Sequence, residues 1–181
     1  MTPFVTVYTT VYLGLGSNQG DRSAHLRRAV RALGSRASVR SLRASAVYES
    51  EAHTIDPDDA PPDFLNAAVE VQTTDSPETL LRAAQDLEAR AGRPPESDRR
   101  VWAPRPLDVD ILVYGSATRS TPDLSIPHPR LGERRFVLEP LADLDPTLRI
   151  PAPFCTDVRS LLNECPDDGT LRRTSLSLTD A

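Results

Sequence analysis

The feature that most constrains the fold is a pair of strands in direct succession between residues 39 and 73. VRSLRASAVYES (39–50) is rich in Val and Ser and partly alternates, and FLNAAVEVQT (64–73) alternates apolar with polar residues, as a half-buried strand does. No helical segment separates the two strands, whereas parallel neighbours need a crossover, usually a helix. The sequence therefore favours a sheet with antiparallel pairs, and an all-parallel doubly wound sheet is the alternative.

Helical segments stand on both sides of this strand pair. After an apolar strand (11–16), Asp21 can cap a helix that Gly34 ends. Ser76 can cap a second helix, which Gly92 ends, and its apolar stripe consists of Leu80, Ala84, Leu87 and Ala91. LDVDILV (107–113) predicts a further strand, and FVLEPLADL (136–144) predicts a strand that passes into a short helix. The order β-α-β-β-α-β predicts an α+β fold: a ferredoxin-like plait of three layers, α/β/α.

Length and composition indicate an ordinary globular protein. The 181 residues predict a single domain, 1–181, with a core at about 10–160 and a loosely held polar tail at about 161–181. The net charge of -5 argues against nucleic-acid binding. The N-terminus does not resemble a signal peptide and no run is long enough to span a membrane, so we expect a cytoplasmic protein. We also expect a monomer, although no sequence feature determines the oligomeric state. All 21 basic residues are Arg, so Arg must hold any bound phosphate.

Two aspartates in the strand 107–113 are the strongest sign of chemistry. Asp108 and Asp110 share one face, about 6.6 Å apart along the strand, while Leu107, Val109, Ile111 and Val113 share the other. A bare pair of carboxylates is tolerated on a solvated edge strand or with a cation between them. Mg²⁺ fits such a pair, because it takes one or two carboxylates together with phosphate oxygens and water.

Arginines around the pair favour the metal interpretation. Arg93, Arg99, Arg100 and Arg105 lie in or beside the loop 93–106, and downstream the cluster contains His128, Arg130, Arg134 and Arg135. Carboxylates for Mg²⁺ beside many Arg residues suit phosphoryl transfer, which depends on charge neutralisation and placement. The run Gly14-Leu15-Gly16 is too weak a signal for a nucleotide loop. It indicates a strand that ends in a tight turn, with close backbone approach to a ligand as the alternative.

At this point the sequence resembles a known family. WAPRPLDVDIL is similar to the signature of 6-hydroxymethyl-7,8-dihydropterin pyrophosphokinase, a folate-pathway enzyme. Other blocks agree in order: LGLGSNQGD, DFLNAAV, LEARAGR and IPHPRLGERRFVLEPL. The resemblance spans about residues 10 to 155. It implies the transfer of diphosphate from ATP to 6-hydroxymethyl-7,8-dihydropterin, with Mg²⁺, in two ions, held by the aspartates.

The resemblance also implies a role for each matching position. The metal-binding pair is Asp108 and Asp110, and the catalytic arginines are Arg93 and Arg105. The positions that bind ATP are Gln85, Glu88, Ile111, His128 and Arg134. The positions that bind the pterin are Phe64, Asn66, Trp102 and Phe136. Two rings and an in-plane amide suit a flat pterin with a polar edge.

Two other functions stay open. A two-metal nucleotidyl transferase also uses a D-x-D pair on a strand, but it would release inorganic diphosphate rather than AMP. A pterin- or nucleotide-binding module would bind both ligands without turnover. The chain departs from the family pattern in the loop after its second strand, where Ser50-Glu51-Ala52-His53-Thr54 replaces Thr-x-Pro and a Gly. Arg99, Arg100, Arg130 and Arg135 receive no role.

Overall fold

The computed structural model describes residues 6–52, 62–94 and 105–179. The elements in this part of the chain are β1 (Thr9–Ser17), α1 (Arg22–Gly34), β2 (Val39–Ala44), β3 (Tyr48–Ser50), β4 (Phe64–Thr73), α2 (Pro77–Arg90), β5 (Asp108–Tyr114), β6 (Arg119–Ser120), β7 (Ser125–Ile126), the 3₁₀ helix η2 (Leu131–Glu133), α3 (Arg135–Leu144), β8 (Arg149–Ile150), β9 (Thr156–Asp157), α4 (Val158–Glu164) and β10 (Leu171–Arg173). None of the helices described is long and apolar enough to cross a membrane.

One antiparallel sheet carries the fold. Its strands lie in the order β10-β3-β4-β1-β5, and β2 also pairs with β4. The predicted strand 39–50 is two strands, β2 and β3, which pair with successive parts of β4: Val39 lies opposite Thr73, and Ser50 lies opposite Phe64. Because every pairing is antiparallel, the predicted α+β plait is confirmed and the all-parallel alternative is wrong.

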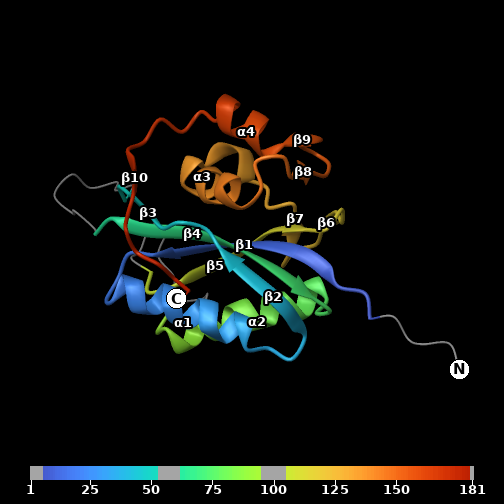
Figure 1. Cartoon of the computed structure of the whole chain (residues 1–181), viewed down its shortest axis with the longest axis horizontal. Helices are drawn as coiled ribbons and strands as arrows, with labels where there is room; N and C mark the ends of the chain where they lie inside the picture. The colour runs from blue at the N-terminus through green and yellow to red at the C-terminus, as the bar shows by residue number, and fades with distance from the viewer. Residues whose placement is uncertain (1–5, 53–61, 95–104, 180–181) are drawn as a thin grey trace, which may run out of the picture.

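Helices cover both faces of the sheet, as Figure 1 shows: α1 and α2 lie on one side, and α3 and α4 on the other. The first core packs side chains of α1 and α2 against one face of the strands. The second packs Leu138 and Leu141 of α3 and Val158 of α4 against the opposite face. The three layers follow from strands whose two faces are both apolar over most of their length.

The helix starts follow the sequence. The side chain of Asp21 accepts a hydrogen bond from the Ala24 amide, and that of Ser76 accepts one from the Thr79 amide. These contacts satisfy amides that the first helical turn leaves without a partner. Both predicted caps are confirmed.

The prediction for residues 136–144 is wrong in its first half. The whole segment lies in the helix α3, which begins at Arg135. Phe136, Val137 and Leu138 are typical of a strand, but Leu138, Leu141 and Leu144 are spaced by three and are all buried on one helix face. Tertiary packing therefore overrides local strand preference.

A β-bulge corrects the predicted face of Val113. The pairing of β1 with β5 shifts so that Tyr12 lies opposite Val113 while Leu13 lies opposite Ile111, which leaves Leu112 as the extra residue. An inserted residue reverses the alternation beyond it. Val113 consequently packs with Leu112 in the core beneath α3, and not with Ile111 on the other face.

Residues 14–16 do not form the predicted turn. Gly14 and Gly16 lie inside β1, opposite Asp110 and Asp108 of β5. The C-terminal residues also differ from the loosely held tail that we expected. They form α4 and then β10, which pairs with β3, and Leu178 is buried in the first core.

Candidate active site

The candidate site lies where three strands meet on the face of the sheet that α3 covers. In the register, Asn66 of β4 lies opposite Gly16 of β1, which lies opposite Asp108 of β5. A Cβ at Gly16 would lie 3.7 Å from Asn66 Oδ1, 3.8 Å from Asp108 Cβ and 3.9 Å from Phe64 Cδ1. A side chain at Gly16 would therefore touch both the amide and the carboxylate, and glycine leaves only backbone between them.

The turn after β1 fixes the entry to β5. The buried side chain of Asn18 accepts a 2.6 Å hydrogen bond from the Arg105 amide, and the Asn18 amide donates to the Arg105 carbonyl at 3.0 Å. Ser17 Oγ donates to the Pro106 carbonyl at 2.6 Å. Each contact is to a backbone atom of the segment before Asp108, so the turn fixes this segment independently of the segment's side chains.

A helix end positions Arg93. Gly92 has a φ of 97°, the Gly92 amide donates to the Ala89 carbonyl, and the Arg93 amide donates to the Glu88 carbonyl. This pattern is a Schellman motif, which requires a residue in the left-handed region and is therefore usually completed by Gly. The chain folds back over the end of α2, and the Arg93 side chain reaches Asp108.

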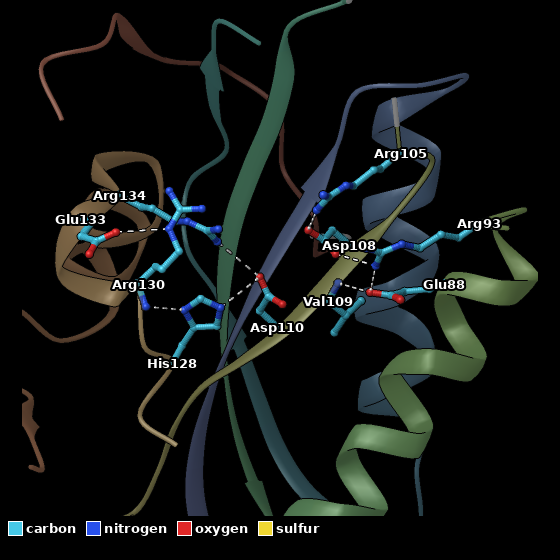
Figure 2. A network of polar contacts seen from close by, with 10 residues as sticks. All are labelled: Glu88, Arg93, Arg105, Asp108, Val109, Asp110, His128, Arg130, Glu133 and Arg134. Atoms are coloured by element: carbon cyan, nitrogen blue, oxygen red, sulfur yellow. Dashed lines mark hydrogen bonds and ion pairs between the residues drawn. The ribbon is translucent and has the colours of Figure 1, made fainter. Parts of the chain in front are cut away.

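Two arginines bind Asp108 (Figure 2). Arg93 donates to Asp108 Oδ1 at 2.6 Å and also forms an ion pair with Glu88, while Arg105 donates to Asp108 Oδ2 at 2.7 Å. Burial acts to raise the pKa of Asp108, but the charges and hydrogen bonds of Arg105 and Arg93 outweigh it and lower this pKa below its usual range. Asp108 is therefore ionised at neutral pH.

Glu88 joins α2 to the outer edge of the sheet. Its carboxylate accepts a 2.9 Å hydrogen bond from the Val109 amide, and only 5% of the residue is exposed. Burial raises the pKa of Glu88 to about 7, although the Val109 amide and Arg93 both act to lower it. Glu88 thus lies at the outer edge of β5, where it interacts with Asp108 directly and through Arg93.

Asp110 faces His128 and Arg134. His128 Nε2 lies 4.0 Å from Asp110 Oδ2, and an Arg134 nitrogen lies 3.8 Å from the same oxygen. Burial, followed by repulsion from Asp108, raises the pKa of Asp110 to about 6. The ion contacts are longer here than at Asp108, so this carboxylate lacks a close positive charge.

His128 is a neutral hydrogen-bond donor at neutral pH. Burial, followed by repulsion from Arg134, lowers its pKa to about 4. The Arg130 amide donates to His128 Nδ1 at 3.1 Å, so the ring proton lies on Nε2, which is directed at Asp110 (Figure 2). The His128 amide donates to the carbonyl of the bulge residue Leu112, which fixes the loop against β5.

Aromatic residues adjoin the acidic pair. Phe64 and Asn66 lie at the start of β4, and Asn66 donates to Ser50 Oγ at 2.9 Å. Phe136, on α3, lines a small cavity together with Ser50, and the guanidinium of Arg134 lies 5.8 Å from the centre of its ring. The ring of Phe136 and the amide of Asn66 therefore adjoin Ser50 from different elements.

Most of the predicted site residues that the structure describes come together, and two of them do not take part in this arrangement. Gln85 is exposed on α2, and the side chain of Ile111 is buried in the core on the far face of the sheet. Trp102 lies outside the described residues, as do Arg99 and Arg100. Arg135 pairs with Glu139 on its own helix, and Arg130 pairs with Glu133.

Sequence reasoning missed two polar residues that organise the site. Asn18 stands within the block LGLGSNQGD, where no role was predicted for it. Its Oδ1 accepts from the Arg105 amide before β5, and its Nδ2 donates to the Pro62 carbonyl before β4 at 3.3 Å. Ser50 was quoted only as a departure from the family pattern. A short polar residue directly after a buried strand is a weak signal, since it is typical of any turn.

The residues present fit a magnesium ion. Within the described ranges no group of three or more His, Cys, Asp or Glu side chains could enclose a metal, so the aspartate pair supplies two carboxylates and no protein cage. Mg²⁺ is usually bound in this way, with phosphate oxygens and water completing its shell. Asp108 repels Asp110, and a cation between the two carboxylates would relieve that repulsion.

Known proteins resemble this chain over most of its length. Residues 12–146 match the family model described as 7,8-dihydro-6-hydroxymethylpterin-pyrophosphokinase (HPPK). The 2-amino-4-hydroxy-6-hydroxymethyldihydropteridine pyrophosphokinase of Bacillus subtilis is 42% identical over 133 residues, 74% of this chain and 76% of the relative. The Aquifex aeolicus protein of the same name is 34% identical over 163 residues, 90% of this chain and 94% of the relative.

Solved structures show the same fold. Wild-type Plasmodium falciparum HPPK-DHPS with pterin and p-hydroxybenzoate superposes with a TM-score of 0.62 at 15% identity, over 88% of this chain and 43% of that longer chain. At this identity the match supports the fold alone, whereas the family model and the curated relatives support membership. The chain belongs to the HPPK family.

Proposed function

We infer that this protein is an ATP-dependent pyrophosphokinase of folate synthesis, which transfers diphosphate from ATP to 6-hydroxymethyl-7,8-dihydropterin. The hydroxymethyl oxygen attacks the β-phosphorus of ATP and loses its proton. The bond between the β-phosphorus and the oxygen that bridges to the α-phosphorus breaks, so the products are AMP and the pterin diphosphate. The observation that carries this function is the Asp108–Asp110 pair, which lies between two arginines at Asp108 and the His128–Arg134 pair at Asp110, beside Asn66 and Phe64.

Asp108 and Asp110 would hold Mg²⁺ together with the triphosphate. The bound ion would neutralise charge on the phosphate oxygens. Arg93 and Arg105 keep Asp108 ionised and fix both of its oxygens. That preorganisation costs nothing during the reaction, because the carboxylate is already held in place.

His128 and Arg134 would bind the triphosphate from the α3 side. The neutral ring of His128 would donate one hydrogen bond without adding charge. The guanidinium of Arg134 would donate hydrogen bonds and add a positive charge. Both lie within 4.0 Å of Asp110 Oδ2, which supports a role at the same phosphates that the ion would contact.

Phe64, Asn66 and Phe136 would bind the pterin. The amide of Asn66 is fixed by Ser50, and its Oδ1 lies next to Gly16, which has no side chain to cover it. A ring stacked on an aromatic side chain and bonded in its own plane can rotate little, so the hydroxymethyl group is directed at the phosphates.

One incubation tests the function. The protein, ATP, Mg²⁺ and 6-hydroxymethyl-7,8-dihydropterin should yield AMP and the pterin diphosphate in equal amounts, with no inorganic diphosphate. Asp110→Asn is the matched control, because it is nearly isosteric and removes one charge. Release of inorganic diphosphate would favour the nucleotidyl transferase, and binding of both ligands without products would favour a binding module.

A further inference from the structure

The C-terminal residues 166–179, called the C-terminal strap below, bind both sides of the sheet. Figure 1 shows this segment passing from α4 on one side to α1 on the other. Its strand β10 pairs with β3, and the Thr174 amide donates to the Val47 carbonyl at 2.8 Å. Beyond β10, Leu178 is buried in the first core, and Arg27 of α1 donates to the Ser177 carbonyl at 3.1 Å. The family model ends at residue 146, before the strap begins.

Asp167 of the strap caps α3. Its Oδ2 accepts a 2.9 Å hydrogen bond from the Arg135 amide, and its Oδ1 accepts a 3.0 Å bond from the Gly169 amide. The residue before the helix, Arg134, makes no capping bond with its own side chain. A carboxylate at this end of a helix satisfies an amide that lacks a helical partner and favours the positive end of the helix dipole. A residue 32 positions away therefore supplies the cap.

The capped turn is the part of α3 that reaches the site. Arg134 and Phe136 flank Arg135 directly, and the guanidinium of Arg134 lies over the Phe136 ring. A cavity of about 90 Å³ brings Phe136 together with Ser50 and Glu51 on one side and Asp167 and Leu171 on the other. The strap therefore forms a wall of the space beside the aromatic ring.

The strap also reaches the second pterin-binding element. Leu171 of β10 lies opposite Ser50 of β3, and Ser50 Oγ accepts the hydrogen bond from Asn66. One segment thus supports Phe136 through the helix cap and Asn66 through the strand next to Ser50. Neither contact places a strap residue among the phosphate-binding groups.

We propose that Asp167 is a positioning residue for the pterin, which holds the first turn of α3 so that Phe136 faces its ligand. The proposal rests on the proposed function, since it assumes that Phe136 stacks on the pterin. It predicts that the pterin loses more affinity than ATP when the cap is lost. Arg134 lies in the same turn, but Asp108, Asp110 and His128 lie on other elements and would still bind Mg²⁺ and the triphosphate.

The test compares Asp167→Ala and Asp167→Asn with Asp168→Ala. Asp168 is exposed and is the next residue in the chain, so its substitution removes the same charge without removing the cap. Titration calorimetry measures the affinity for a methylene ATP analogue with Mg²⁺, which cannot transfer diphosphate, and then for 6-hydroxymethyl-7,8-dihydropterin. Thermal unfolding of each variant is measured as well, to check that the variant is folded.

Asp167→Ala should weaken pterin binding by about three- to tenfold, the range that corresponds to a lost helix cap. Asp167→Asn should weaken it by about twofold, because a single amide oxygen remains to serve the amides of Arg135 and Gly169. Both variants should lose less affinity for the ATP analogue than for the pterin, relative to Asp168→Ala, because Arg134 is the one proposed triphosphate-binding residue in the capped turn. KM for the pterin should rise in parallel while kcat changes little.

Pterin affinity equal to that of Asp168→Ala in both variants would overturn the proposal. So would an equal loss of pterin and ATP analogue, which would indicate a general loss of structure. If Asp167→Ala does not fold, Asp167→Asn decides alone. A failure of the proposed function is distinguishable, because wild-type protein would then bind no pterin or form no AMP.

Discussion

Arg93 and Arg105 both bind Asp108, yet we expect their removal to have very different effects on stability. The Arg93 side chain is 10% exposed and joins Asp108 to Glu88, which is itself 7% exposed. The Arg105 side chain is 39% exposed and contacts Asp108 alone among the acidic residues described. Burial decides the magnitude, because breaking a buried ion pair costs about 3–5 kcal/mol and an exposed pair contributes about 0–1 kcal/mol.

Arg93→Ala should therefore lower the free energy of unfolding by about 2–3 kcal/mol, below the full buried value because Asp108 keeps Arg105. Arg105→Ala should lower it by about 1 kcal/mol or less. With a urea m-value of about 2 kcal/mol/M, the midpoints should fall by about 1–1.5 M and by at most about 0.5 M. Urea unfolding at pH 8 measures both shifts, and an unchanged m-value shows that the comparison is valid.

A double substitution identifies the cause. Glu88→Gln keeps an oxygen that can accept from the Val109 amide but removes one of the two carboxylates next to Arg93. Arg93→Ala combined with Glu88→Gln should therefore recover part of the lost stability. The reasoning fails if Arg93→Ala and Arg105→Ala shift the midpoint equally, or if Glu88→Gln makes Arg93→Ala worse.

Three further changes test the proposed roles. Asp108→Asn or Asp110→Asn should lower kcat by at least about 100-fold, as loss of a group that stabilises transferred charge does, and circular dichroism should show an intact fold. Phe64→Ala should raise KM for the pterin and leave KM for ATP unchanged in steady-state assays, because its ring adjoins Asn66 and not the cations. The pKa of folded His128 is about 4, below its unfolded value, so the contribution of His128 to stability falls by up to about 3 kcal/mol as pH falls from about 6.5 towards 4. The raised pKa values of Glu88 and Asp110 add stability over the same range. Urea unfolding at pH 7 and pH 4.5 should therefore show that His128→Gln gains stability relative to the wild-type protein as the pH falls.

Local patterns predicted the parts of the site that depend on one element. Asp108 and Asp110 share a face because strand side chains alternate, and the caps at Asp21 and Ser76 form because a short polar side chain before a helix reaches its first turn. The order of helices and strands predicted the plait, because a strand that follows another without a helix must pair antiparallel. These inferences need no knowledge of distant contacts.

Contacts between distant elements escaped prediction. The bulge at Leu112 moves Val113 to the other core, and neither residue differs in type from an ordinary strand residue. The placement of Arg134 against Asp110 depends on where α3 begins, and the apolar run 136–138 indicates a strand when its burial is unknown. Such features are decided by packing of the whole fold, which no short window of sequence contains.

The C-terminal strap shows why a polar segment can be as well determined as an apolar one. β10 has only three residues, and its pairing with β3 uses backbone groups, which carry no sequence signal. An isolated strand of this length would not form, so the pairing depends on anchors at its two ends. Leu178 supplies apolar burial beyond β10, and Asp167 supplies a hydrogen bond to α3 before it. Because both anchors lie outside the strand, a short stretch of sequence centred on β10 predicts only a polar tail. In the structure, β10 adds a further strand to the sheet beside the candidate pterin site.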